Sequence, residues 1–76
     1  MSALRPVHYS TLVKVFEQVG FRFDRQRGDH MIYTRPDVLR PLVVPMYDEV
    51  PVFIIKNLLR TSGVSRERYF ELLQIV

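Results

Sequence analysis

Apolar side chains recur at helical spacing near the start of the chain. Positions spaced i, i+3, i+4 and i+7 lie on one face of a short helix. They are Leu12, Val15, Phe16 and Val19. Ser10 precedes them and has the side chain of a helix N-cap, and Gly20 follows them, where a left-handed residue commonly ends a helix. The pattern predicts an amphipathic helix between Ser10 and Gly20.

Alternation with a period of two then replaces the helical spacing. Segment 21–27 places its two phenylalanines on one face, with Arg22 and Asp24 on the other. Gly28-Asp29 is a turn signal, and segment 30–35 resumes the alternation. The two faces of this second segment are His30, Ile32 and Thr34 against Met31, Tyr33 and Arg35. The pattern predicts two antiparallel strands joined at Gly28-Asp29.

A third short strand follows these two. Pro36-Asp37 closes the second strand, and Arg40-Pro41 opens the next. Leu42-Val43-Val44 is apolar and β-branched, which favours a strand that ends at Pro45.

Helical spacing returns in the last part of the chain. Pro51, preceded by acidic residues, indicates a helix start, and Gly63 indicates its end. The apolar stripe of this helix is Ile54, Ile55, Leu58 and Leu59. Ser65 is the expected cap of a last helix, with a stripe of Tyr69, Leu72, Leu73 and Val76. The predicted order is therefore α-β-β-β-α-α.

This order predicts the α+β class, with a three-stranded antiparallel sheet and helices on one of its faces. No linker or repeat interrupts residues 1–76, which we expect to form one domain. The chain has no cysteine, so disulfides and thiolate metal ligands are excluded. No apolar stretch approaches the roughly 18 residues of a membrane span, and we see no signal-peptide pattern, so we expect a cytoplasmic protein.

The charge of the chain is moderately basic. Its formal net charge is +3, and 9 of its 11 basic residues are arginine. Arginine has a planar fork of donors that suits phosphate oxygens. Five arginines and three aspartates lie between Arg22 and Arg40, a local net charge of +2. This balance permits a nucleic-acid partner without requiring one.

Candidate chemistry centres on the run Arg27-Gly28-Asp29-His30. A histidine can take or give a proton near neutral pH, as cleavage of RNA without a metal requires. The alternative is that His30 only begins a strand and bonds to the turn. Gly28 would allow phosphate to approach the backbone, or would simply be a hairpin glycine. Asp29 would hold the tautomer of His30, or would be an ordinary turn residue.

The candidate RNA contacts are cationic and aromatic side chains near this run. Arg25, Arg27, Arg35 and Lys56 are the candidate phosphate contacts, and each has the alternative of a solvated surface charge. Tyr33 is a candidate for stacking on a base, with core packing as the alternative. We interpret His8 as a surface or capping residue. Two separated histidines do not make a metal site, and we expect no cofactor.

The same residues, in this order, resemble the HicA toxins of bacterial toxin–antitoxin operons. The similarity runs from about Thr11 to the end of the chain. Its strongest parts are Val19-Gly20-Phe21, Arg27-Gly28-Asp29-His30, Ile32-Tyr33, Pro45, Ile55-Lys56-Asn57-Leu58-Leu59 and Ser62-Gly63-Val64-Ser65. The resemblance implies a fold like that of double-stranded-RNA-binding domains and the activity of an mRNA interferase. It also implies His30 as the catalytic histidine and a cognate HicB-like antitoxin as partner.

Three positions depart from the pattern of that family. Asp29 replaces the usual serine, Tyr47 replaces a frequent histidine, and Val52-Phe53-Ile54 replaces a common Gly-Thr-Leu. These departures leave two alternatives to the nuclease open. One is a non-catalytic RNA-binding module on the same fold, and the other is a protein-interaction domain.

Overall fold

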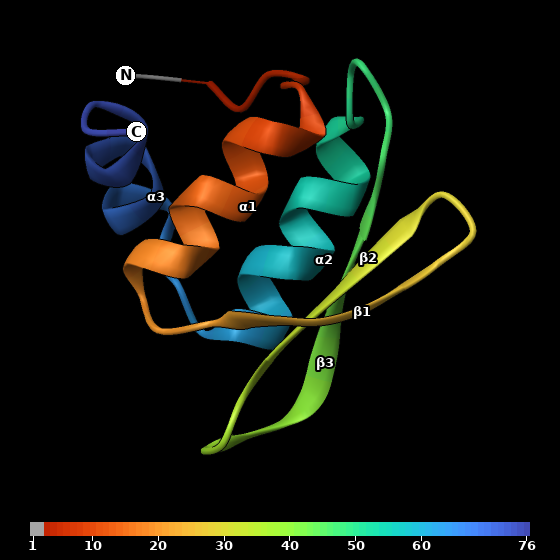
Figure 1. Ribbon diagram of the computed structural model, residues 1–76. Helices are drawn as coiled ribbons and strands as arrows, with labels where there is room; N and C mark the ends of the chain where they lie inside the picture. The colour runs from red at the N-terminus through yellow and green to blue at the C-terminus, as the bar shows by residue number, and fades with distance from the viewer. Residues whose placement is uncertain (1–2) are drawn as a thin grey trace.

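The computed structural model describes residues 3–76, which contain three helices and three strands in the order α-β-β-β-α-α (Figure 1). The elements are α1 Tyr9–Gln18, β1 Arg22–Arg27, β2 His30–Arg35, β3 Val38–Pro45, α2 Val52–Ser62 and α3 Arg66–Leu73. The predicted α+β class and the predicted order are confirmed.

The strands form one antiparallel sheet in the order β1-β2-β3, so β2 is its central strand. The register pairs Tyr33 with Leu42 and Ile32 with Val43. Residues directly opposite each other in an antiparallel pair point to the same side of the sheet. Tyr33 and Leu42 belong to the buried core, so they mark the face that the helices cover. His30 and Ile32 point to the other face, as the alternation predicts.

Strand β3 is longer than the sequence predicts. It begins at Val38 rather than at Leu42, and Pro36-Asp37 form the turn before it. The sequence does not predict residues 38–41 as strand, because they show no apolar alternation and Pro41 is typical of a strand end. In the structure, Leu39 and Arg40 are exposed. An edge strand tolerates such residues, because only one side of it is paired.

Helix α1 begins at Tyr9, so the prediction of Ser10 as its N-cap is wrong. The ring of His8 performs that role, because its Nδ1 accepts a hydrogen bond from the backbone N–H of Ser10 at 3.1 Å. A ring nitrogen supplies the acceptor that a serine oxygen would otherwise provide. This confirms the interpretation of His8 as a capping residue. Gly20 has a φ of 94° just past the helix, as predicted.

The two C-terminal helices are bounded as predicted, with one exception. Gly63 ends α2 with a φ of 76°, and the Ser65 hydroxyl accepts a hydrogen bond from the backbone N–H of Arg68 at 3.0 Å. Val76 was assigned to the apolar stripe of α3, but it is exposed and lies beyond the end of the helix at Leu73. The buried contacts of α3 stop at Leu72, so no packing holds a further turn.

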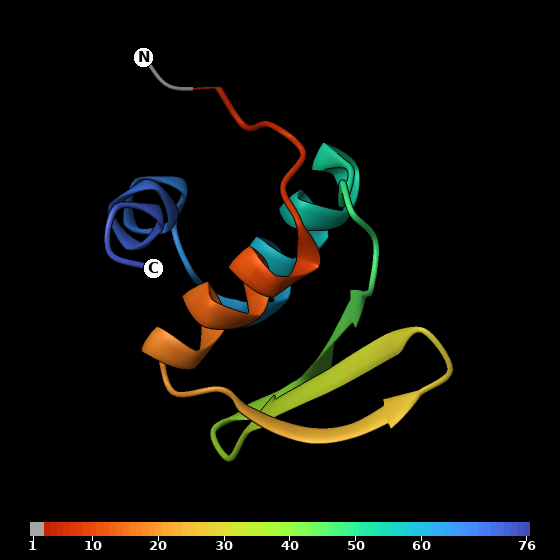
Figure 2. The ribbon, with the colours of Figure 1, turned by 45° about the horizontal axis from the view of Figure 1, so that its top comes forward.

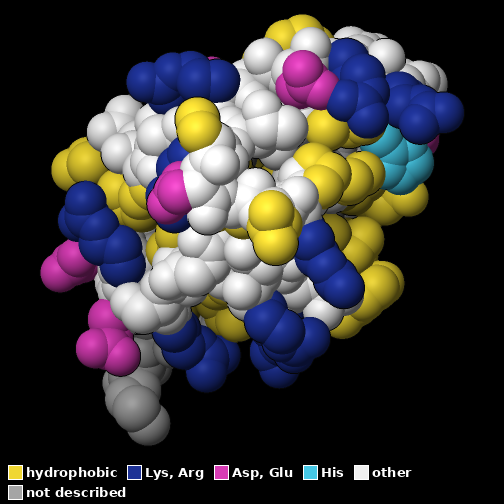
Figure 3. Space-filling model, turned by 90° about the horizontal axis from the view of Figure 1, so that it is seen from below, with side chains coloured by type: hydrophobic (Ala, Val, Ile, Leu, Met, Phe, Trp, Pro, Cys, Tyr) yellow, Lys and Arg dark blue, Asp and Glu magenta, His cyan; other side chains and the backbone are white. Residues whose placement is uncertain are grey.

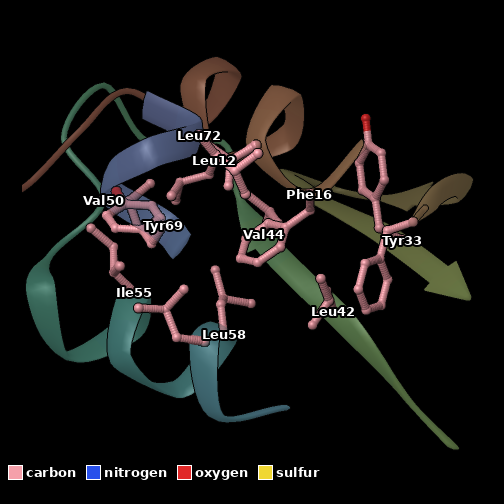
Figure 4. Close-up of a cluster of buried hydrophobic side chains, with 13 residues drawn as sticks. Leu12, Phe16, Tyr33, Leu42, Val44, Val50, Ile55, Leu58, Tyr69 and Leu72 are labelled. Carbon is pink, nitrogen blue, oxygen red and sulfur yellow. The ribbon is translucent and has the colours of Figure 1, made fainter. Parts of the chain in front are cut away.

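Helices α1 and α2 lie on the concave side of the curved sheet, and α3 packs beside α1 (Figure 2). The apolar faces of the three helices meet the inner face of β2 and β3 in one cluster (Figure 4). Its members include Leu12, Phe16, Tyr33, Leu42, Val44, Val50, Ile55, Leu58, Tyr69 and Leu72. Packing in this core holds β2 and β3 in place. His30 is the first residue of β2, so its backbone position is held as well.

One polar atom in this core lacks a partner. The hydroxyl of Tyr69 is buried and makes no hydrogen bond within residues 3–76. Burial also raises the pKa of Tyr69, because the charged phenolate is disfavoured in apolar surroundings.

We therefore expect Tyr69→Phe to stabilise the protein. Removing an unsatisfied buried hydroxyl should raise the free energy of unfolding by about 1 kcal/mol, measured by urea denaturation. Tyr47→Phe is the matched control, because the Tyr47 side chain is exposed, and it should leave the midpoint unchanged. A Tyr69→Phe protein less stable than the wild type would contradict the expectation.

Candidate functional site

The turn between β1 and β2 is a tight hairpin. Gly28 has a φ of 59°, whereas no non-glycine residue of the described chain has a positive φ, so Asp29 does not. This combination matches a type II′ turn, which favours glycine at its first central position. The backbone carbonyl of Asp29 accepts a hydrogen bond from the backbone N–H of Met46 at 2.7 Å. The predicted turn is confirmed, and the segment that follows β3 holds it in place.

His30 is accessible to solvent at the end of this turn. Its Nδ1 lies 2.9 Å from the Oδ1 of Asp29, and the two side chains are 43% and 66% exposed. The contact brings the carboxylate and the imidazole together as an ion pair when the ring is protonated. That Asp29 holds the tautomer of His30 stays a prediction.

Two arginines of β1 share the face of His30. Arg27 is the partner of His30 in the sheet register, and Arg25 is the partner of Ile32. The guanidinium of Arg25 is paired with Asp24, whereas Arg27 has no carboxylate partner among the described residues. The site therefore has one free guanidinium next to the imidazole and a second, partly neutralised one further along β1.

Arg35 does not belong to this site, although the sequence placed it among the phosphate contacts. Its Nη1 donates to the backbone carbonyl of Val19, and its Nε donates to Asp37, both at 2.7 Å. Its guanidinium carbon also lies 4.8 Å from the centre of the Phe21 ring. The bond from Arg35 lowers the pKa of Asp37. Arg35 joins β2 to the end of α1, and its donors are used within the fold.

Tyr33 is also outside the site, so the prediction that it stacks on a base is wrong. Only 3% of its surface is exposed, and its ring packs edge-to-face against Phe23 with the centroids 5.8 Å apart. Burial raises the pKa of Tyr33, and the charge of Glu17 raises it further. The alternation of β2 points Tyr33 to the helix side, which a single strand pattern could not identify as the covered side.

Lys56 is remote from His30. It lines a hollow with Leu4, Leu59 and Val64. The hollow that contains His30 is lined by other residues of α2, among them Asn57 and Thr61. The structure therefore brings together His30, Arg25, Arg27 and Gly28, and it separates them from Arg35, Tyr33 and Lys56.

A groove of about 310 Å³ adjoins His30 between β3 and α2. We call it the β3–α2 groove, and its lining includes His30, Val43, Pro45, Tyr47, Asn57 and Thr61. Figure 3 shows a histidine flanked by Lys or Arg side chains and by a patch of hydrophobic side chains. This groove was not predicted from the sequence. The signal that could have indicated it is the alternation of β3, which points Val43 away from the side of its buried neighbours Leu42 and Val44.

None of the helices within residues 3–76 is both long and apolar enough to cross a membrane. No three His, Cys, Asp or Glu side chains in this range gather as potential metal ligands.

A family model described as the HicA toxin of bacterial toxin–antitoxin matches residues 9–64. This range spans α1, the whole sheet and α2, and it includes the hairpin turn and His30. The chain matches no curated protein.

Proposed function

Because the chain belongs to the HicA toxins of bacterial toxin–antitoxin systems, we propose that it cleaves mRNA as an endoribonuclease, with His30 as general acid/base. Membership of this family supports a toxin role and an antitoxin partner. The observation that carries the catalytic proposal is the 2.9 Å contact between Asp29 and His30. It orients a solvent-accessible imidazole next to the free guanidinium of Arg27.

The proposed reaction begins with a proton transfer. Nε2 of His30 removes the proton of a ribose 2′-hydroxyl, and the 2′ oxygen attacks the adjacent phosphorus. The new bond closes a cyclic phosphate, while the bond from phosphorus to the 5′ oxygen breaks. The departing oxygen takes a proton from water, to which the half-exposed site gives access, and the hydroxide that is left takes the proton from Nε2, which restores the neutral ring. A proton on Nδ1, 2.9 Å from the carboxylate of Asp29, would leave Nε2 free to act as the base.

The arginines would stabilise the phosphate as its charge develops. Guanidinium donors bind phosphate oxygens through two parallel hydrogen bonds, and donors held in place before the reaction lower its barrier. Arg27 is first for this role, since it has no carboxylate partner in the described chain, and Arg25 is second. A Cβ at Gly28 would meet no atom within 4 Å, so the turn backbone is open to an approaching phosphate.

The proposed partners follow from this activity. The substrate is mRNA, and the antitoxin is a HicB-like protein that binds over His30. No metal enters the proposed reaction, because the imidazole moves the proton and the guanidinium groups carry the charge.

A second candidate function is RNA binding without cleavage. The observation that favours it is the carboxylate of Asp29, 66% exposed beside the imidazole. A negative charge at this place opposes the approach of a phosphate.

The test is cleavage of single-stranded RNA by the purified protein in the presence of a chelator. We expect RNA fragments, and we expect no cleavage of the same oligonucleotide when its 2′-hydroxyls are replaced by hydrogen. If the protein binds RNA and yields no fragments between pH 5 and 9, the second candidate replaces the first. Activity that disappears with the chelator and returns with a divalent metal would refute the metal-free reaction.

A further inference from the structure

The β3–α2 groove does not end at its apolar part. A second hollow, of about 540 Å³, lies further along the same two elements. Thr61 lines both hollows, and Arg40 of the second is the chain neighbour of Pro41 of the first. The two hollows therefore adjoin each other at Thr61, and we call them together the depression between β3 and α2, with His30 in one hollow and Arg40 in the other.

The far end of this depression is cationic. Its lining contains the three guanidinium groups of Arg35, Arg40 and Arg60, against the single carboxylate of Asp37. Asp37 is already paired with Arg35 at 2.7 Å. Arg40 and Arg60 have no carboxylate partner within residues 3–76, and the only side-chain bond of Arg60 there is 3.3 Å long, to Asn57. Two positive charges thus face solvent at this end without a counter-charge.

The near end is apolar and aromatic. Val43 and Tyr47 line it together with His30 and are 43% and 42% exposed. Asn57 is the side chain of this part that can pair with the edge of a base, since an amide both donates and accepts. Apolar walls with a few polar groups are typical of a ligand site, and single-stranded RNA is bound by stacking of bases and by cations along its backbone.

We propose that single-stranded RNA lies along this depression, with bases in the apolar part and one phosphate each at Arg40 and Arg60, remote from the cleavage point. The inference rests on the proposed function and extends it to the path of the substrate. From Pro45 to Arg40 the strand covers about 17 Å at the usual rise per residue, which gives room for more than one nucleotide. The charge of the far end and the apolar character of the near end match the two parts of an RNA chain.

The experiment measures RNA binding rather than cleavage. The probe is a fluorescent single-stranded RNA of about 12 nucleotides, made with 2′-O-methyl sugars so that it stays intact, and its anisotropy is followed at several salt concentrations. Arg40→Ala and Arg60→Ala should each make the dependence of log K on log salt less steep by about 0.7, the value for one phosphate of a single strand. Arg66→Ala is the matched control, because Arg66 is an exposed arginine in the hollow on the other side of α2, which Arg60 also lines and Arg40 does not. It should leave the slope unchanged.

The outcomes separate this inference from the proposed function. If Arg40→Ala leaves the salt slope unchanged and the wild-type protein cleaves RNA, the proposed RNA path is wrong and the proposed nuclease activity stands. A slope lowered by Lys56→Ala and not by Arg40→Ala also overturns it, because the RNA would then lie on the other side of α2. A wild-type protein that neither binds nor cleaves RNA overturns both. Thermal melting of each variant shows whether a lost interaction reflects lost folding.

Discussion

Substitution of His30 by alanine should lower the rate of RNA cleavage by about 100-fold to 10,000-fold, which is the usual contribution of a general acid or base. The imidazole is the group that would move the proton, and its Nδ1 lies 2.9 Å from Oδ1 of Asp29. The side chain is 43% exposed, so its removal leaves the core intact and should change stability little. The measurement is the initial rate of fragment formation from one labelled RNA, with the melting temperature of the variant recorded beside it.

The other histidine of the chain is the control for this substitution. His8 caps α1 and lies 3.6 Å from Asp48. His8→Ala should cost about 1 kcal/mol of stability through the lost cap and should retain full activity below its melting temperature. Full activity in His30→Ala, or an equal loss in both variants, would refute the assignment of His30 as the catalytic residue.

Substitution of Phe16 by alanine should destabilise the protein by about 3–5 kcal/mol, because it removes a large ring from the core and leaves a cavity. Phe16 is completely buried and packs edge-to-face on Phe21 with the ring centroids 6.0 Å apart. A protein of this size has a total stability of roughly 4–11 kcal/mol, so the variant should be largely unfolded well below the melting temperature of the wild type. Circular dichroism during urea denaturation measures the change.

Phe23→Ala is the control, since it removes the same ring from a position that is 51% exposed. It loses the contact with Tyr33 and should cost about 1 kcal/mol. An equal loss of stability in the two variants would contradict the placement of Phe16 in the core and of Phe23 at the surface.

The sequence was sufficient to predict the elements and the two faces of β2. Its alternation separated His30 and Ile32 from Tyr33 and Arg35, and the register shows the same separation. It could not show which face the helices cover, because both faces of this strand carry apolar and polar residues. Tyr33 and Arg35 were therefore assigned to RNA, although the first is in the core and the second binds the end of α1.

The position of the groove could not be predicted, for a related reason. Lys56 and Asn57 are adjacent in the chain, but successive residues of a helix point about 100° apart. Only the packing of α2 against β3 decides that Asn57 lines the groove while Lys56 lies in another hollow. In the same way, Arg40 was read as the opening of a strand. The structure places it with Arg60 in the lining of one hollow, and this proximity is the basis for proposing it as a phosphate contact.

The hydrogen bond from the backbone N–H of Met46 to the carbonyl of Asp29 has a consequence for the affinity of the proposed RNA substrate. It anchors the hairpin turn before His30 to the segment after β3 in the free protein, so the turn is preorganised. Immobilising a flexible loop upon association would weaken binding by the conformational entropy of each residue that becomes ordered. In this protein the turn is already ordered by folding, so binding of RNA would not have to offset that entropy.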